Sequence, residues 1–74
     1  MKFDYGKLRG KIKEKFNTQN AFADAMGVSA VTISDKLNNK VQWTQKEMDM
    51  ACSLLDIDSA EIPIYFFTIK VKEL

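Results

Sequence analysis

The sequence contains no histidine, a single cysteine (Cys52) and a single proline (Pro63). Without histidine there is no imidazole base for a nucleophile pair, and one cysteine supports neither an intrachain disulfide nor a zinc site of the usual ligand spacing. We therefore expect no bound metal and no cofactor. Cys52 falls within an apolar stripe of a helix, which predicts a buried side chain that packs in the core and is not a reactive thiol. The chain is not expected to be an enzyme.

Long apolar runs are also missing. No segment approaches the ~20 residues that span a bilayer, and the first ten residues are charged and lack the hydrophobic stretch of a signal peptide. We expect a cytoplasmic protein with no membrane contact. The 74 residues suffice for one small domain, and a core of that size supplies only ~3–5 kcal/mol. An enzyme's enclosed cavity would be hard to support, so a binding module is the better interpretation.

The net charge is only +1, but the charge is unevenly distributed. Residues 1–46 hold nine lysines and arginines and four carboxylates, which gives +5, whereas residues 47–74 hold two lysines and six carboxylates, which gives −4. A polyanion would attract the first part and repel the second, so the molecule would dock in one orientation. The alternative is that the first lysines merely form the solvated face of a helix.

Apolar residues recur at helical spacing over most of the chain, which predicts an all-α fold. Capping residues and a glycine mark the helix ends. The predicted helices are a first through Leu8, Ile12 and Phe16, a second from Gln19 to Met26 ended by Gly27, a third from Ala30 to Leu37 capped by Ser29, and a fourth from the T-x-x-E capping box at Thr44 to about Asp56.

The spacing of the apolar residues changes after the fourth helix. A fifth short helix is predicted over residues 58–62, limited by Pro63. Phe67, Ile69 and Val71 then alternate with polar residues, which is the pattern of a half-buried strand. Because no second strand is evident in the chain, we expect this candidate strand to pair with its copy in another subunit. The alternative is an extended tail that plugs the helical core.

Two short helices joined by a glycine turn are typical of a helix-turn-helix, whose second helix fits the DNA major groove. From Gln19 to Lys40 the chain reads QNAFADAMGVSAVTISDKLNNK. This stretch resembles the helix-turn-helix of the lambda-repressor-like family, which includes the Cro and CI repressors of temperate phages and their bacterial relatives. The residues in register with that pattern are Gln19, Ala23, Gly27, Ile33 and Asn38, with Phe22, Met26 and Val28 at its apolar positions.

Two residues depart from the family pattern. Lys36 occupies a position where many members have a large apolar residue, and Asn39 replaces the usual glycine of the following turn. The whole chain is similar to the short Cro-like or repressor-type proteins of phages that infect Gram-positive bacteria. The resemblance implies one four- or five-helix DNA-binding domain over residues 1–74, with its helix-turn-helix at 19–37, that represses transcription.

The resemblance also implies which residues read bases. Alanine and valine in the third helix would contact thymine methyl groups, while hydroxyl groups donate or accept hydrogen bonds. Asp35 would accept from a cytosine amino group, or would instead pair with Lys36 or Lys40 in a structural role. The implied base-reading residues are Ser29, Ala30, Val31, Thr32 and Asp35.

Phosphate contacts are implied on either side of these residues. The start of the second helix favours an anion because its N–H groups and dipole point there. The loop after the third helix would grip the DNA backbone. The implied phosphate-binding residues are Gln19, Lys36, Asn38, Asn39 and Lys40.

The expected partner is a double-stranded DNA operator, an inverted repeat read by a homodimer. The tail at 64–74 is the candidate dimer contact, through Phe67, Ile69 and Val71, and deletion of residues 66–74 is expected to leave a folded domain with weaker operator binding. The alternative function is a protein-interaction module, such as an antirepressor or antitoxin-like partner.

Overall fold

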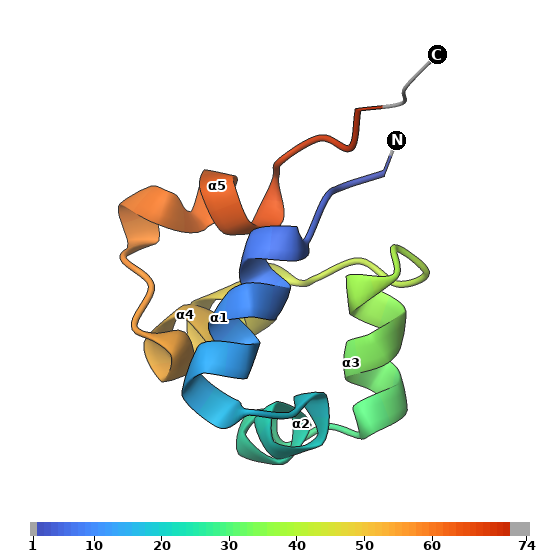
Figure 1. The fold of residues 1–74 in the computed structure, drawn as a ribbon, viewed down its shortest axis with the longest axis vertical. Helices are drawn as coiled ribbons and strands as arrows, with labels where there is room; N and C mark the ends of the chain where they lie inside the picture. Colours follow the sequence, from blue (N-terminus) through green and yellow to red (C-terminus); the bar gives the residue numbers. More distant parts are fainter. Residues whose placement is uncertain (1, 72–74) are drawn as a thin grey trace.

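The computed structural model describes residues 2–71, and its regular elements in that range are all helical. This confirms the predicted all-α class. Figure 1 shows α1 running through the middle of the molecule with the other helices around it. The elements are α1 (Gly6–Phe16), α2 (Gln19–Met26), α3 (Ala30–Leu37), α4 (Gln45–Leu55), the 3-10 turn η1 (Ser59–Glu61) and α5 (Ile62–Phe66).

The second and third helices begin and end as predicted. The Thr18 hydroxyl accepts a hydrogen bond from the Ala21 N–H at 3.1 Å, which caps α2. Gly27 ends that helix in the left-handed conformation, with φ of 75°. A residue with a Cβ is strained there, so the tight connection to α3 depends on this glycine.

The fourth helix starts with the capping box expected from its sequence. The Glu47 carboxylate accepts from the Thr44 N–H at 2.8 Å, and the Thr44 hydroxyl accepts from the Glu47 N–H at 3.1 Å. These two bonds satisfy N–H groups that have no partner within the helix. Farther along α4, Cys52 is buried as predicted, and burial raises the pKa of its thiol.

The core forms where the helices meet. Trp43 lies beside Phe66 with ring centroids 5.2 Å apart and beside Tyr5 at 6.4 Å, both edge-on. These contacts attach α5 and the start of α1 to the segment that precedes α4. The largest fully buried side chains are Phe22, Phe66, Leu8, Ile12, Ile33 and Leu55.

The predicted end of the last helical segment was wrong. Pro63 does not limit that segment; it lies in the first turn of α5, which continues to Phe66. The first residues of a helix need no intrahelical N–H partner, and the fixed φ of proline suits them.

The chain does contain a partner for the period-two segment, contrary to expectation. Ile69 forms an isolated antiparallel bridge with Phe3. The Asp4 N–H donates to the Thr68 carbonyl at 2.7 Å, and the Lys70 N–H donates to the Lys2 carbonyl at 3.0 Å. Within residues 2–71, this single bridge does not extend into a β-strand. The alternation identified an extended segment, but its partner is the N-terminal segment of the same chain.

The structure does not support the prediction that deletion of residues 66–74 leaves a folded domain. The Phe66 side chain is only 1% exposed and contacts Trp43. Phe67 packs edge-on against Phe3 with centroids 5.8 Å apart. Because the deletion would remove a core side chain, loss of DNA binding in that variant would report loss of folding. Residues 72–74 of this tail lie outside the described residues.

Candidate nucleic-acid interface

The third helix is held by one side and presents the other to solvent. Ile33 and Leu37 are buried in the core at 0% and 2% exposure, whereas Val31 is 68% exposed. The Ser29 hydroxyl caps the helix by accepting from the Thr32 N–H at 3.1 Å. The Val31 side chain is therefore accessible on a helix whose opposite side is fixed in the core.

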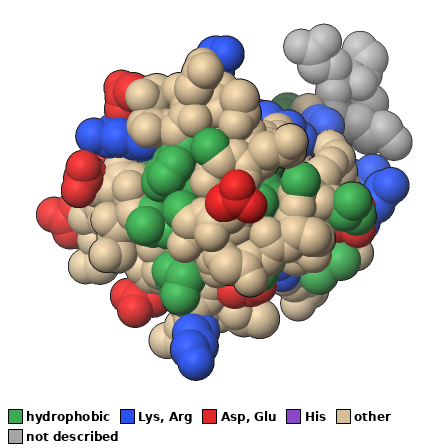
Figure 2. Space-filling view, turned by 90° about the horizontal axis from the view of Figure 1, so that it is seen from below, with side chains coloured by type: hydrophobic (Ala, Val, Ile, Leu, Met, Phe, Trp, Pro, Cys, Tyr) green, Lys and Arg blue, Asp and Glu red, His purple; other side chains and the backbone are tan. Residues whose placement is uncertain are grey.

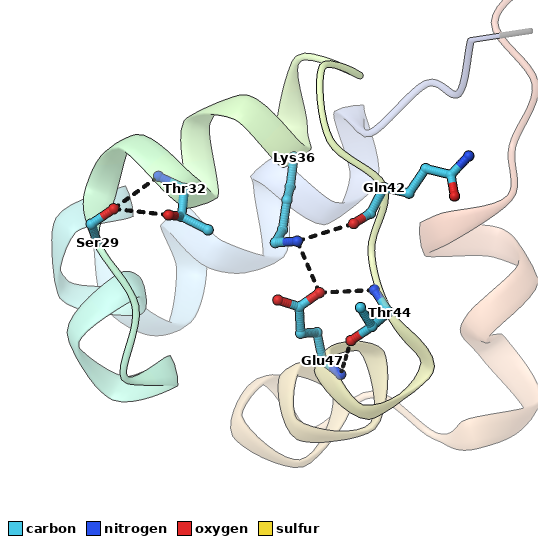
Figure 3. A network of polar contacts seen from close by, with 6 residues as sticks. All are labelled: Ser29, Thr32, Lys36, Gln42, Thr44 and Glu47. Carbon is cyan, nitrogen blue, oxygen red and sulfur yellow. Dashed lines mark hydrogen bonds and ion pairs between the residues drawn. The ribbon is translucent and has the colours of Figure 1, made fainter.

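The structure places the five predicted base-reading residues on or directly before α3. Ser29 and Val31 are exposed, while Ala30, Thr32 and Asp35 are half-buried. The hydroxyl oxygens of Ser29 and Thr32 lie 2.9 Å apart (Figure 3), so one hydroxyl donates to the other. Asp35 forms no ion pair with Lys36 or Lys40. The alternative in which the Asp35 carboxylate pairs with one of these lysines is therefore not supported.

Lys36 does not lie where a phosphate contact requires it. Its side chain points inward and the residue is 4% exposed. The ammonium lies 2.9 Å from Glu47 Oε1 and donates to the Gln42 carbonyl at 3.0 Å (Figure 3), and it lies 6.0 Å from the centre of the Trp43 ring. The phosphate role predicted for Lys36 is corrected here: the cation connects α3 to the capping box of α4.

The bonds from Thr44 and Lys36 together set the protonation of Glu47. Burial alone would raise the pKa of this carboxyl group. The bonds from the Thr44 N–H, the Lys36 ammonium and the Thr44 hydroxyl outweigh that effect, and the pKa lies below its ordinary value. Glu47 is therefore ionised at neutral pH and neutralises the buried ammonium.

The loop after α3 is held by the N-terminal part of the chain. The Asn39 side chain accepts from the Phe3 N–H at 2.8 Å and donates to the Phe3 carbonyl at 2.9 Å. Asn39 has a φ of 63°, in the left-handed region that asparagine tolerates. Glycine, the usual residue at this position in the resembled family, adopts the same conformation. The Asn39 amide is engaged within the chain, so the predicted phosphate contact through the Asn39 side chain is corrected.

Three predicted phosphate-binding residues keep accessible groups. Gln19 is the first residue of α2 and is half-buried, and Lys40 is exposed in the loop after α3. Asn38 accepts from Arg9 Nη2 at 3.0 Å and donates to the Ser34 hydroxyl at 3.3 Å, but it is exposed, and the second N–H of its amide is left for a phosphate. Sequence reasoning missed Arg9, which comes from α1 and has no local signal linking it to α3.

The surface around α2 is mixed in charge. Figure 2 views the molecule from below, the side on which α2 lies in Figure 1, and shows hydrophobic and acidic side chains across this face with Lys and Arg at its margins. Lys36 is the one cation in the sequence of α3, and its ammonium is turned inward. The outward side of α3 thus offers apolar, hydroxyl and carboxylate groups, without a cation of its own.

Within residues 2–71, no helix is long and apolar enough to cross a membrane. Over the same range, no cluster of three or more metal-binding side chains is found.

The comparisons agree with a small helical regulatory domain. The family described as "Protein of unknown function (DUF739)" matches residues 1–69, and the chain belongs to this family. The chain is also similar to the modulator of repression (MOR) of the temperate bacteriophage TP901-1 from Lactococcus lactis, known from a solution structure. The two are 49% identical, with a TM-score of 0.81 and 97% of each chain covered. The prediction that the chain is not an enzyme agrees with this similarity. No curated protein sequence matches.

Proposed function

We propose that α2 and α3 form a lambda-repressor-like helix-turn-helix, and that the protein regulates transcription by placing α3 in the major groove of operator DNA. The observation that carries the proposal is the anchoring of α3. Its inner side chains Ile33 and Leu37 are buried, and Val31 is directed to solvent at 68% exposure. The similarity to a phage modulator of repression supports a role in the control of repression.

In this proposal, the groove contacts come from Ser29, Ala30, Val31, Thr32 and Asp35. Val31 and Ala30 contact thymine methyl groups, and the coupled hydroxyls of Ser29 and Thr32 bond to base edges. Gln19, Asn38 and Lys40 hold the DNA backbone and set the register of the helix.

Salt dependence of duplex binding tests this proposal. The logarithm of the association constant should fall against the logarithm of salt concentration with a slope of about 0.9 per phosphate neutralised. Fluorescence anisotropy with a labelled duplex at several salt concentrations measures the slope. A flat response, or no binding at low salt, would contradict a DNA-binding function.

A specific observation favours a second candidate, a protein-interaction module that acts on a repressor or another regulator. The outward side of α3 has an exposed valine but no cation, since the Lys36 ammonium is paired with Glu47 at 2.9 Å. Apolar surface with few charges is typical of the centre of a protein interface. In this case α3 would dock against protein instead of a groove.

Dimerisation through the tail is part of the DNA-binding proposal, and the backbone bonds support it. Backbone hydrogen bonds join Asp4 to Thr68 on one side of the Phe3–Ile69 bridge and Lys70 to Lys2 on the other. In this antiparallel pattern, the N–H and C=O groups of Ile69 itself point away from Phe3. No described residue bonds to these two groups. In Figure 1 the N-terminal segment lies between the tail and the loop after α3, which leaves the tail outermost. A second copy can pair there, antiparallel about Ile69.

The side chains on this tail suit such a pairing. Phe67, Ile69 and Val71 are 47%, 54% and 84% exposed. Pairing centred on Ile69 places Thr68 of one copy opposite Lys70 of the other, and no like charges meet. The apolar residues of both copies then come together on one side.

Ile69→Lys is expected to weaken dimerisation by about tenfold or more, because two like charges would face each other across the two-fold axis. Sedimentation equilibrium over a concentration series measures the association. Val31→Lys is the matched control, since it introduces the same charge at an exposed apolar position on α3. A wild-type chain that stays monomeric at every concentration, or a dimer unaffected by Ile69→Lys, would contradict this contact.

A further inference from the structure

Two lysines lie directly opposite each other where the N-terminal segment and the tail pair. The Lys70 N–H donates to the Lys2 carbonyl at 3.0 Å, one residue beyond the Phe3–Ile69 bridge. Opposite residues of an antiparallel pair project to the same face, and like charges in this arrangement destabilise the pair. Neither lysine forms an ion pair with a described carboxylate. Within residues 2–71, the repulsion between these two lysines is not relieved by a direct ion pair.

A third cation, Arg9 of α1, lines the same hollow as Lys2 and Lys70. Its Nη2 donates to the Leu37 carbonyl at 3.1 Å and to Asn38 Oδ1 at 3.0 Å, which fixes the guanidinium beside the end of α3. The remaining N–H groups of this guanidinium have no acceptor among the described residues. A fixed guanidinium with free donors is ready to bind an anion.

These three residues are among those that line one hollow of about 190 Å³ between the N-terminal segment, the tail, the start of α1 and the loop after α3. Asp4 is the one carboxylate in its lining. Asp4 Oδ1 accepts from the Gly6 N–H at 2.8 Å and forms no ion pair with the three cations. The charged side chains of the hollow therefore carry an excess of positive charge.

We propose that this hollow binds a phosphate group of the DNA backbone, through Lys2, Arg9 and Lys70. The identification of the anion rests on the proposed function, because the hollow adjoins Asn38 and Asn39, directly after the helix assigned to the groove. The arginine fork matches phosphate oxygens, and the two lysines add point charges. A bound phosphate removes the repulsion between Lys2 and Lys70.

The site gives the N-terminal segment and the tail a defined role. Phosphate contacts fix the orientation of a protein on the duplex and carry no base information of their own. Arg9 already holds the last turn of α3, so a phosphate on Arg9 fixes that helix relative to the DNA backbone. The site also supplies cations beside α3, whose own lysine is buried.

The test is the double variant Lys2→Gln/Lys70→Gln in the full chain, titrated with duplex DNA at several salt concentrations. The salt slope should fall by about 1.8, the value expected when two phosphate charges are no longer neutralised, with base preference unchanged. Lys13→Gln/Lys46→Gln is the matched control, because it removes the same charge from exposed positions outside the hollow. Equal reductions in both double variants would overturn the site.

A titration with inorganic phosphate against chloride at constant ionic strength separates this site from the proposed function. Saturable amide NMR shifts at Lys2, Arg9 and Lys70 that disappear in the double variant support the anion site. If the wild-type chain binds phosphate in this way but no duplex, the anion site stands and the assignment to DNA is overturned. If no saturable shifts occur, the site itself is overturned.

Discussion

Glu47→Gln is expected to destabilise the protein by about 3 kcal/mol, the usual effect of leaving one charge of a buried pair uncompensated. The Lys36 ammonium would stay buried with the Gln42 carbonyl as its remaining strong partner. Glutamine retains an oxygen that can accept from the Thr44 N–H, so most of the loss comes from the charge. Urea unfolding measures the change, and thermal unfolding should show a fall in Tm on the order of 12–24 °C.

Lys36→Met is the informative counterpart. Methionine places an apolar side chain where the resembled family has one, and Glu47 keeps its bonds to Thr44. We expect a smaller loss of stability than in Glu47→Gln, because the carboxylate left unpaired is half-buried and keeps its bonds to Thr44, whereas the ammonium left unpaired in Glu47→Gln is only 4% exposed. Glu61→Gln, at an exposed carboxylate, is the control. Equal losses of stability in the Lys36 and Glu47 variants would contradict this role of the ion pair.

The same pair predicts a pH dependence. The pKa of Glu47 in the folded protein lies below its ordinary value of 4.5. Its contribution to stability is therefore fully present above pH 4.5 and is lost as the pH falls through the lower, folded-state pKa. Glu47→Gln should lack this part of the acid destabilisation.

The double variant Val31→Ala/Thr32→Ala is expected to lose about 30-fold or more in affinity for the operator, since each base contact contributes about 1–3 kcal/mol and two contacts are lost. Binding to unrelated duplexes and its salt dependence should persist, because backbone contacts remain. Folding should be little affected, since Val31 is exposed and the Ser29 cap uses the Thr32 backbone N–H. Anisotropy titrations with specific and unrelated duplexes measure both affinities.

Val41→Ala is the matched control, at a 47% exposed valine outside α3. Loss of a protein partner, with DNA binding unchanged, would favour the interaction module. Unchanged operator affinity together with unchanged partner binding would contradict both assignments to α3.

The helices were predictable because their signals are local. Thr18, Gly27 and Ser29 fix the ends of α2 and α3, and Thr44 with Glu47 forms a capping box visible in four residues. Each of these interactions joins residues at most a few positions apart. The bounds of these helices followed from the sequence.

The errors concern contacts between distant segments. Arg9 bonds to Asn38, and Asn39 bonds to Phe3, across 29 and 36 residues, and no periodicity connects them. Lys36 was assigned a phosphate contact because the resembled family grips the DNA backbone after the third helix, although many members of that family have an apolar residue at this position. Its partner Glu47 was recognised as a capping residue, but the sequence does not show that one carboxylate serves both the cap and the cation.

The central claim is that α3 reads duplex DNA. Selection of sequences bound by the full wild-type chain from a pool of random duplexes tests it most directly. We expect enrichment of an inverted repeat whose half-sites lie about one helical turn apart, and loss of that enrichment in Val31→Ala/Thr32→Ala. A pool that stays random after repeated rounds at low salt would contradict the claim.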